Sequence, residues 1–234
     1  MELTFASYNI HKAVGVDRRR DSDRILAILS EIDADVVALQ EADRRFGRRM
    51  SVLPLEAIHE RTPYEPVAMS LKPDSLGWHG NALLVRRNID IVAAAPVPLP
   101  VLEPRGAVRA DLAVGGRVVR VVGMHLDLSG LRRRHQIRSV LDHVGACDEH
   151  CPTVLMGDLN EWASRGGCFR EFGAHWRVLS PGRSFPSRRP VAQLDRIIIS
   201  REWQLVGTTV HHSALSAKGS DHLPVRATLT LPKI

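Results

Sequence analysis

The sequence is poor in cysteine, and this shortage excludes a disulfide framework. Only Cys147, Cys151 and Cys168 are cysteines among 234 residues, and an odd number in a chain of this length predicts free thiols in a reducing compartment. The alternative is a zinc site formed by Cys147 and Cys151 with His143 and His150. It is disfavoured because the pair lacks the C-x-x-C spacing of structural zinc sites, so ordinary packing cysteines are expected.

Long apolar runs are also missing. No stretch of about 18 uninterrupted apolar residues occurs, as a spanning helix requires, and residues 1–10 carry no basic region ahead of an apolar run. We therefore expect a soluble, cytoplasmic protein with no transmembrane segment. At 44% hydrophobic content, with no repeat, low-complexity tract or linker, the chain can bury one sizeable core but is short for two. We predict a single domain over residues 1–234.

Lysine and aromatic residues are scarce, whereas arginine is abundant. The net charge is +6, and among the 32 basic residues the lysines are Lys12, Lys72, Lys218 and Lys233. Clusters such as Arg18-Arg19-Arg20 can clamp phosphates, which favours an acidic partner such as nucleic acid. A GC-rich genome would give the same composition with ordinary surface arginines. Aromatics at 5% provide few platforms on which bases could stack.

Short apolar runs recur along the chain and are bounded by Gly, Pro, Asn or Asp. These β-branched runs predict strands at residues 3–10, 36–40, 82–85, 118–124, 154–156, 194–199 and 225–231. Two segments, 21–32 and 131–147, instead place apolar residues at helical spacing. The proline-rich segments 96–104 and 181–190 are expected to be surface loops. Many strands with few helices predict two packed sheets flanked by helices.

Polar residues stand at the ends of these apolar runs. Asp158 and Asn160 follow the run at 154–156, His125 follows 118–124 and Glu41 follows 36–40. A layered fold gathers strand ends at one rim, so we expect these side chains to lie close together. A carboxylate can take a proton from water, and an imidazole can stabilise the negative charge that develops on a phosphorane. Hard oxygen ligands bind divalent cations, so the residue types point to metal-assisted cleavage of a phosphoester.

A series of short motifs covers nearly the whole chain. In order they are Ser7-Tyr8-Asn9-Ile10, Leu39-Gln40-Glu41, Gly80-Asn81-Ala82, His125-Leu126-Asp127, Gly157-Asp158-Leu159-Asn160, Leu194-Asp195-Arg196 and Ser220-Asp221-His222. Together they resemble the endonuclease/exonuclease/phosphatase superfamily, which includes pancreatic deoxyribonuclease, abasic-site endonucleases, neutral sphingomyelinases and inositol-polyphosphate phosphatases. The resemblance implies a four-layer α/β/β/α sandwich of the deoxyribonuclease-like kind, with two facing, mainly antiparallel sheets.

The resemblance also implies a metal site and a water-activating site. Glu41 would be the principal ligand of Mg²⁺ or Mn²⁺, helped by Asn9 and Asp221. Asp158 would activate or orient the attacking water, and Asn160 would hold a phosphate oxygen.

Two histidines complete the implied site. Asp195 would pair with His222 and favour its imidazolium form, so that His222 can donate to the phosphate or the leaving oxygen. His125 would contact the phosphate from the other side. The deoxyribonuclease branch gives this histidine a carboxylate partner, which the matching stretch 79–81 does not supply. Asn81 and Arg105 would bind the substrate phosphate.

The expected activity is hydrolysis of a phosphoester by in-line attack of water, most simply by a metal-dependent phosphodiesterase acting on nucleic acid. Because the fold and core site are shared by many enzymes, two other substrate classes stay open, namely a phospholipid head group, as for a sphingomyelinase, and a small phosphate ester. A non-catalytic binding module of the same fold is disfavoured, since all the core acids and both histidines are present.

Overall fold

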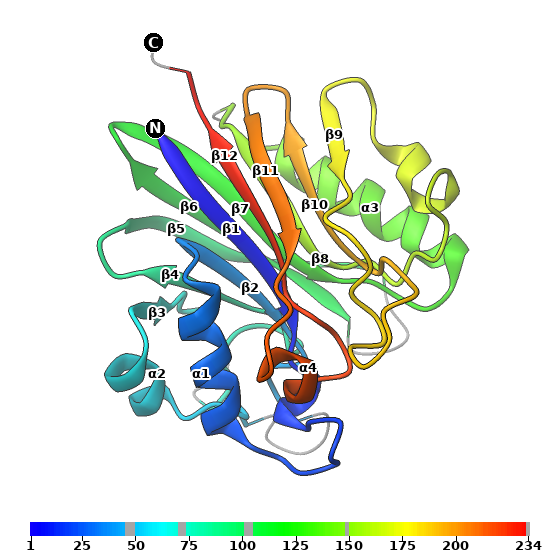
Figure 1. The fold of residues 1–234 in the computed structure, drawn as a ribbon. Helices are drawn as coiled ribbons and strands as arrows, with labels where there is room; N and C mark the ends of the chain where they lie inside the picture. The colour runs from blue at the N-terminus through cyan, green and yellow to red at the C-terminus, as the bar shows by residue number, and fades with distance from the viewer. Residues whose placement is uncertain (45–49, 70–73, 101–104, 148–149, 233–234) are drawn as a thin grey trace.

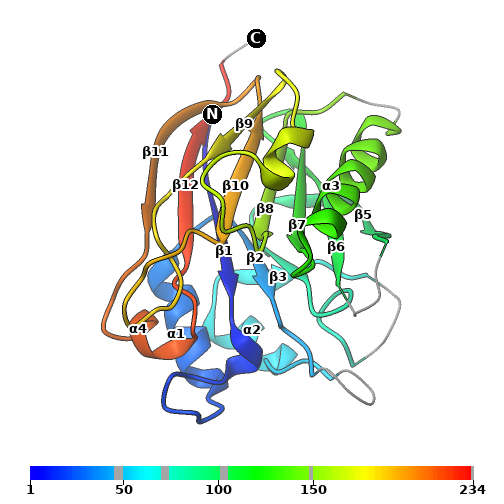
Figure 2. The same cartoon turned by 90° about the vertical axis from the view of Figure 1, so that its right-hand side faces the viewer.

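The computed structural model describes residues 1–44, 50–69, 74–100, 105–147 and 150–232. Figures 1 and 2 show two sheets that face each other, with α1 outside one sheet and α3 outside the other. No helix in these ranges is long and apolar enough to cross a bilayer. The arrangement confirms the predicted four-layer sandwich.

Within the described residues, each sheet has six strands and one parallel pair. The first contains β1 (Glu2–Asn9), β2 (Val36–Gln40), β3 (Tyr64–Pro66), β4 (Ala82–Arg86), β11 (Gln204–Val210) and β12 (Val225–Thr230), in the order β11-β12-β1-β2-β4-β3. The second contains β5 (Asp90–Val97), β6 (Gly106–Val114), β7 (Arg117–His125), β8 (Thr153–Asp158), β9 (Trp176–Leu179) and β10 (Asp195–Ser200), in the order β5-β6-β7-β8-β10-β9. Neighbouring strands are antiparallel except for β1–β2 and β7–β8.

The central strands are apolar on both faces because each face packs against another layer. In β8, Val154 and Met156 point into the space between the sheets, whereas Leu155 packs on the side of α3. β1 alternates in the same way, with Phe5 between the sheets and Tyr8 on the side of α1. Side chains alternate along a strand with period two, so one uninterrupted apolar run serves two cores.

The helices of the described residues range from 4 to 16 residues in length. They are α1 (Ser22–Ile32), α2 (Leu55–Arg61), α3 (Gly130–Gly145) and α4 (Ser216–Gly219), with 3₁₀ turns η1 (His11–Ala13) and η2 (Gly167–Glu171). Asp21 caps α1, since its side chain accepts a hydrogen bond from the backbone N–H of Arg24 at 2.9 Å. Helices α1 and α3 confirm the two segments that helical spacing predicted.

One predicted loop was partly wrong. Pro96 and Val97 belong to β5 rather than to a loop, which is allowed because β5 is an edge strand and its proline need not donate to a neighbour on the open side. Residues 101–104 of the same prediction lie outside the described residues. The segment 181–190 is irregular, as expected, yet Ser184 and Ser187 within it are fully buried.

Gly157 should be required for the parallel β7–β8 pair. A Cβ atom at this position would lie 1.8 Å from the carbonyl oxygen of Met124, which is backbone and cannot move aside. We expect Gly157→Ala to lower the free energy of unfolding by about 1–3 kcal/mol or more, measured by urea denaturation. Gly145→Ala is the control, because nothing lies within 4 Å of its added Cβ and it should stay within about 1 kcal/mol of wild type. Equal stability of both variants would contradict the tight pairing.

Candidate active site

Strand register places three of the predicted site residues side by side. His125 pairs with Asp158 across β7–β8, and Asp158 pairs with Asp195 across β8–β10. All three continue the set of side chains that faces the opposite sheet, and they are 5%, 1% and 0% exposed. They therefore form a row at the mouth of the inter-sheet space.

The first sheet supplies residues that face this row. Asn9, at the end of β1, donates from Nδ2 to Asp158 Oδ2 at 3.0 Å. Its Oδ1 accepts the backbone N–H of His11 at 3.1 Å. Glu41 follows β2 with a left-handed φ of 55°, and such a conformation in a non-glycine residue is frequent at functional sites. The two sheets thus meet at Asp158.

Asp158 is a buried carboxylate surrounded by donors. Its Oδ1 accepts the backbone N–H of Asn160 at 2.9 Å, and its Oδ2 lies 3.4 Å from His125 Nε2 and 3.7 Å from His222 Nε2. Burial disfavours the negative charge, but His222, His125 and the Asn160 N–H outweigh burial and hold the pKa of Asp158 well below its ordinary value. This carboxylate is ionised at every physiological pH.

His222 is held between two carboxylates. Its Nδ1 is 2.9 Å from Asp195 Oδ2, and the hydroxyl of Ser184 donates to the same oxygen. Burial opposes a charge on the ring, but the charges of Asp195 and Asp158 outweigh it and raise the pKa of His222 to about 10. The ring is therefore an imidazolium whose Nε2–H points toward the Asp158 side of the site.

Asn160 is fixed just behind Asp158. It adopts a left-handed φ of 49°, and its Nδ2 donates to the carbonyl oxygen of Leu126 at 2.9 Å. One of its two amide hydrogens remains for another acceptor. The predicted neighbourhood of Asp158, Asn160, Asp195 and His222 is thus present in the structure.

The predicted metal ligands are joined through the turn η1. Lys12 contacts the carboxylate of Glu41 through Nζ, and His11 Nδ1 lies 3.8 Å from Asp221 Oδ1. Burial raises the pKa of Glu41, but the hydrogen bond from Lys12 and the charge of His125 lower it overall. The position beside Glu41 therefore accepts a positive charge. Two carboxylates and the Asn9 amide oxygen are the hard donors that Mg²⁺ and Mn²⁺ prefer, so the donor set fits such an ion.

A second group must be compared with this one. Among the described residues, Asp158, Asp195 and His222 form the group of three acidic or imidazole side chains whose ligand atoms lie within 4.8 Å of one another. A protonated imidazole offers no lone pair to a metal, and in the metal-free protein the charges of Asp195 and Asp158 raise the pKa of His222. The geometry of this group is that of a carboxylate–imidazolium–carboxylate chain.

His125 has a different partner from the one that the resemblance led us to seek. Arg105, just before β6, lies against the imidazole, with Nη1 2.8 Å from Nδ1. The same Nη1 also contacts Nε2, so Arg105 lies against both nitrogens of the ring. The register explains the contact, because Gly106 pairs with His125 across β6–β7.

Asn81 also lies near Glu41. It is 1% exposed, and its Oδ1 is a buried oxygen with no hydrogen-bond partner among the described residues. The preceding Gly80 accepts a hydrogen bond from the N–H of Ala42, the residue after Glu41. An amide oxygen only accepts, so this atom can meet a cation or a hydrogen-bond donor.

Sequence reasoning missed Lys12 and Ser184. Lys12 lies within a run of left-handed residues, His11, Lys12 and Ala13, which no local pattern announces. Ser184 lies in an irregular segment, yet its carbonyl oxygen accepts the backbone N–H of Leu223 at 2.8 Å. The one available signal was the position of Lys12 two residues after the Ser7–Ile10 motif.

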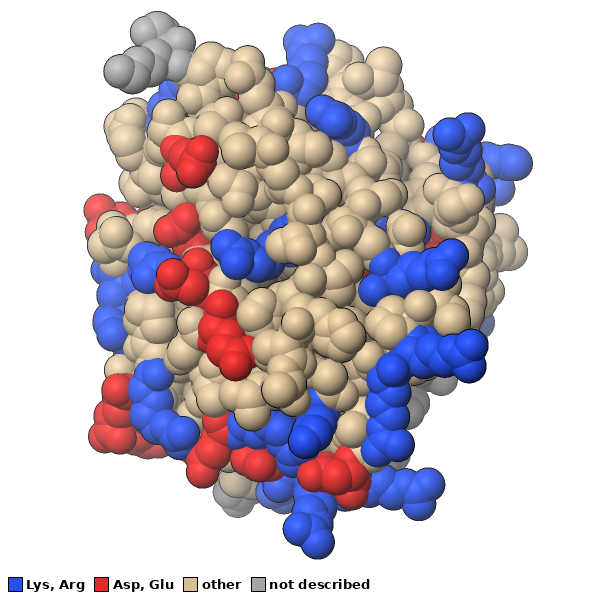
Figure 3. Space-filling view, viewed as in Figure 1, with Lys and Arg blue, Asp and Glu red and all other residues tan. Residues whose placement is uncertain are grey.

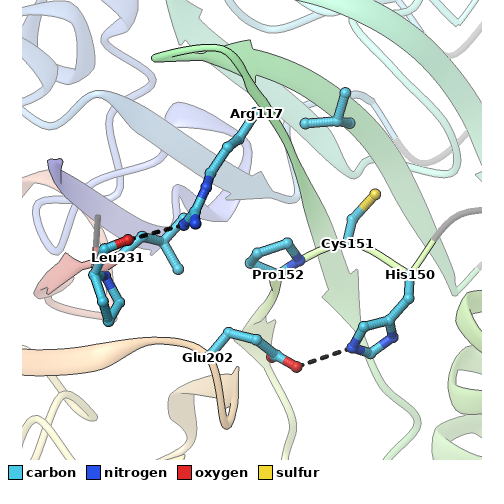
Figure 4. Close-up of a pocket in the computed structure, with 8 residues that line it drawn as sticks. Arg117, His150, Cys151, Pro152, Glu202 and Leu231 are labelled. Atoms are coloured by element: carbon cyan, nitrogen blue, oxygen red, sulfur yellow. Dashed lines mark hydrogen bonds and ion pairs between the residues drawn. The ribbon is translucent and has the colours of Figure 1, made fainter. Parts of the chain in front are cut away.

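A separate pocket of about 560 Å³ opens at the other end of the sandwich. Cys151 and Pro152, which precede β8, help to line it, whereas Asp158 ends the same strand at the candidate site. Figure 4 shows Arg117 at one side and the His150–Glu202 pair at the other. The length of β8 separates this pocket from the residues described above.

His222 should remain charged well above neutral pH. Because its pKa of about 10 exceeds its ordinary value of 6.5, the ion pair contributes fully to stability below pH 6.5 and is lost as the pH rises through about 10. NMR titration of the metal-free protein should show this ring protonated at pH 8. Asp195→Asn should lower its pKa. A ring that titrates near 6.5 in the wild-type protein would contradict the described pairing.

Comparisons with known proteins show which sequences and folds the chain is similar to. The chain is 26% identical over 244 residues to the uncharacterised protein YbhP of Escherichia coli K12. The aligned region covers 95% of this chain and 94% of YbhP. D. rerio TDP2 in complex with a single-strand DNA product has a similar fold, with a TM-score of 0.74, 16% identity, and coverage of 98% of this chain and 99% of that chain. A mannosyl-6-phosphatase from Bacteroides thetaiotaomicron has a TM-score of 0.73 and 18% identity, over 98% of this chain and 100% of that chain.

At these identities the two solved structures show the fold alone. The sequence profile of the Endonuclease/Exonuclease/phosphatase family, however, matches residues 6–222, a range that includes every residue of the row from His125 to Asp195 and extends to His222. The chain therefore belongs to the endonuclease/exonuclease/phosphatase family, whose members are hydrolases.

Proposed function

We propose that the protein is a divalent-metal-dependent phosphodiesterase that cleaves nucleic acid by in-line attack of water. The observation that carries the proposal is the buried row His125–Asp158–Asp195 with His222 at 2.9 Å from Asp195. In this pair, the ionised carboxylate can orient the attacking water, and the protonated imidazole can stabilise the charge that develops on the phosphoryl group.

Asp158 positions the attacking water. Its lowered pKa makes it fully ionised but a weak base, so it orients the water and takes its proton as the new bond forms. Asn160 offers its remaining amide hydrogen to a phosphate oxygen. His222 donates from Nε2 to the phosphoryl group or the leaving oxygen, because Nδ1 is engaged with Asp195.

Glu41, Asn9 and Asp221 would hold the metal ion. When bound, Mg²⁺ or Mn²⁺ polarises the phosphoryl group and neutralises charge on the leaving oxygen. Lys12 contacts the Glu41 carboxylate, so an ion held there would take the place of that contact. Arg105 binds a phosphate oxygen beside His125, and Asn81 donates to another from the Nδ2 hydrogen that its bond to Trp78 O leaves over.

Exposed arginines support a polyanionic substrate. Lys and Arg lie along the lower-right edge of the molecule in Figure 3 and, interspersed with Asp and Glu, along its lower edge, the end at which β1 finishes in Figure 1. Loops that leave the site strands at this end expose Arg18, Arg19, Arg165, Arg188 and Arg189. Such arginines contact phosphates along a strand. The TDP2 structure of similar fold was obtained with a single-strand DNA product, which is consistent with this choice.

A small phosphate ester is the second candidate. The observation that favours it is the comparable likeness to the mannosyl-6-phosphatase. A monoester is recognised at a single phosphate, so its turnover would not need the exposed arginines. The effect of ionic strength distinguishes a nucleic-acid substrate from a small phosphate ester, because affinity for a nucleic acid falls steeply with salt.

Metal-dependent turnover should require Asp158 and Glu41. We expect the wild-type protein with Mg²⁺ or Mn²⁺ to nick supercoiled plasmid or degrade RNA, with a KM that rises steeply from 50 to 200 mM salt. Asp158→Asn should lower kcat by about 10²–10⁴-fold, and Glu41→Ala should abolish the metal dependence. The panel should include bis-p-nitrophenyl phosphate, mannose 6-phosphate and dispersed phospholipid.

Asp90→Asn is the matched control, because it makes the same chemical change at an exposed residue of β5. It should leave turnover unchanged. Activity confined to mannose 6-phosphate or phospholipid would replace the proposed substrate. Full activity of a pure Asp158→Asn preparation would remove Asp158 from the mechanism.

A further inference from the structure

Trp162 is an exposed tryptophan two residues beyond Asn160. It is 66% exposed, whereas its neighbours Asn160 and Glu161 are 8% and 4% exposed. Single exposed apolar residues are common and need no explanation by themselves. The position of this one, directly after the buried site residues, makes its surroundings informative.

The backbone beneath Trp162 is firmly held. The Glu161 carboxylate accepts the N–H groups of Ala163 at 3.1 Å and Cys168 at 3.0 Å, and it pairs with Arg133 Nη2 at 3.2 Å. Arg133 is itself 7% exposed. The hydrogen bond of Asn160 to Leu126 fixes the other side. The indole is therefore presented to solvent from a rigid base, which lowers the entropy cost of binding a ligand.

Aromatic rings connect Trp162 to the catalytic imidazole. Trp162 meets Phe185 edge to face, with ring centroids 6.2 Å apart and planes at 87°. Phe185 in turn lies 4.8 Å from the ring of His222. The indole is thus two ring contacts from the group that we assign to the phosphate, and Phe185 is the ring that contacts both.

The surrounding charge indicates the kind of ligand. Arg165 is exposed three residues beyond Trp162, and Arg188 and Arg189 are exposed in the loop that carries Phe185. A ligand that fits must combine an anionic group at His222 with a flat unsaturated ring beside it. A nucleotide has both, and stacking of a base on an aromatic side chain tolerates any sequence.

We propose that Trp162 is a substrate-binding residue that stacks on the nucleobase next to the phosphate held at His222. The inference rests on the proposed nucleic-acid substrate and adds a specific contact to it. Trp162 contributes affinity for the base, and it takes no part in water activation or in metal binding. Its removal should therefore weaken binding of bases without altering the contribution of the phosphates.

The test is binding without turnover. Fluorescein-labelled oligo(dT) and an oligonucleotide of the same length with abasic tetrahydrofuran sites carry the same phosphates, but only the first has bases. In EDTA, with the full-length chain, wild type should bind oligo(dT) more tightly, and Trp162→Ala should weaken that binding by about 5- to 150-fold, the size measured for stacking of one base. Affinity for the abasic oligonucleotide should not change.

Two controls separate stacking from a general effect. Trp162→Phe keeps a ring and should retain most of the preference for oligo(dT). Val206→Ala removes an apolar residue of similar exposure, 59%, from β11, and should change neither affinity. Quenching of tryptophan fluorescence by oligo(dT), lost in Trp162→Phe, would place the base on the indole.

Four outcomes would overturn the proposal. Equal loss of affinity for both oligonucleotides in Trp162→Ala would mean that the variant disturbs phosphate binding. An unchanged preference for bases, with loss of binding to anionic phospholipid vesicles, would assign Trp162 to a lipid surface. Failure of wild type to bind either oligonucleotide would reject the base contact and the proposed substrate together, whereas phosphate-only binding would reject the base contact alone.

Discussion

The buried charge of Asp158 is the constraint on which the site depends. An ionised carboxylate withdrawn from water costs several kcal/mol unless other groups compensate it. Here the compensating groups come from separate elements, with Asn9 from β1, His125 from β7 and His222 from the loop before β12. The charge can be buried only when both sheets are correctly packed, so the chemistry of the site and the assembly of the sandwich are linked.

The same alternation of side chains produces both the core and the site. Residues of β8 that face the opposite sheet are apolar at Val154 and Met156 and become acidic at Asp158. In β10 the order is reversed, from Asp195 to the apolar Ile197. A shift of one residue in either strand would move these acids to the helix side. A shift in β8 would also place a residue with a Cβ at the position of Gly157, where that atom would clash with the carbonyl oxygen of Met124.

The sequence indicated the central strands because both of their faces are buried, which leaves continuous apolar runs such as 36–40. It did not indicate β5 or β11, whose exposed faces interrupt the apolar pattern, or β6, where Arg109 and Asp111 intervene. The acids and histidines of the site were found through ordered motifs. The contacts of Arg105, Lys12 and Ser184 were not, because they depend on strand register and on a left-handed turn.

Direct measurement of metal binding tests the central claim that the cation is held by Glu41 and not by the Asp195–His222 pair. Mn²⁺ binding can be followed by electron paramagnetic resonance in wild type, Glu41→Gln and Asp195→Asn. We predict that Glu41→Gln loses the bound ion and that Asp195→Asn retains it. Loss of Mn²⁺ in Asp195→Asn with normal binding in Glu41→Gln would place the metal at Asp158, Asp195 and His222 and would contradict the account.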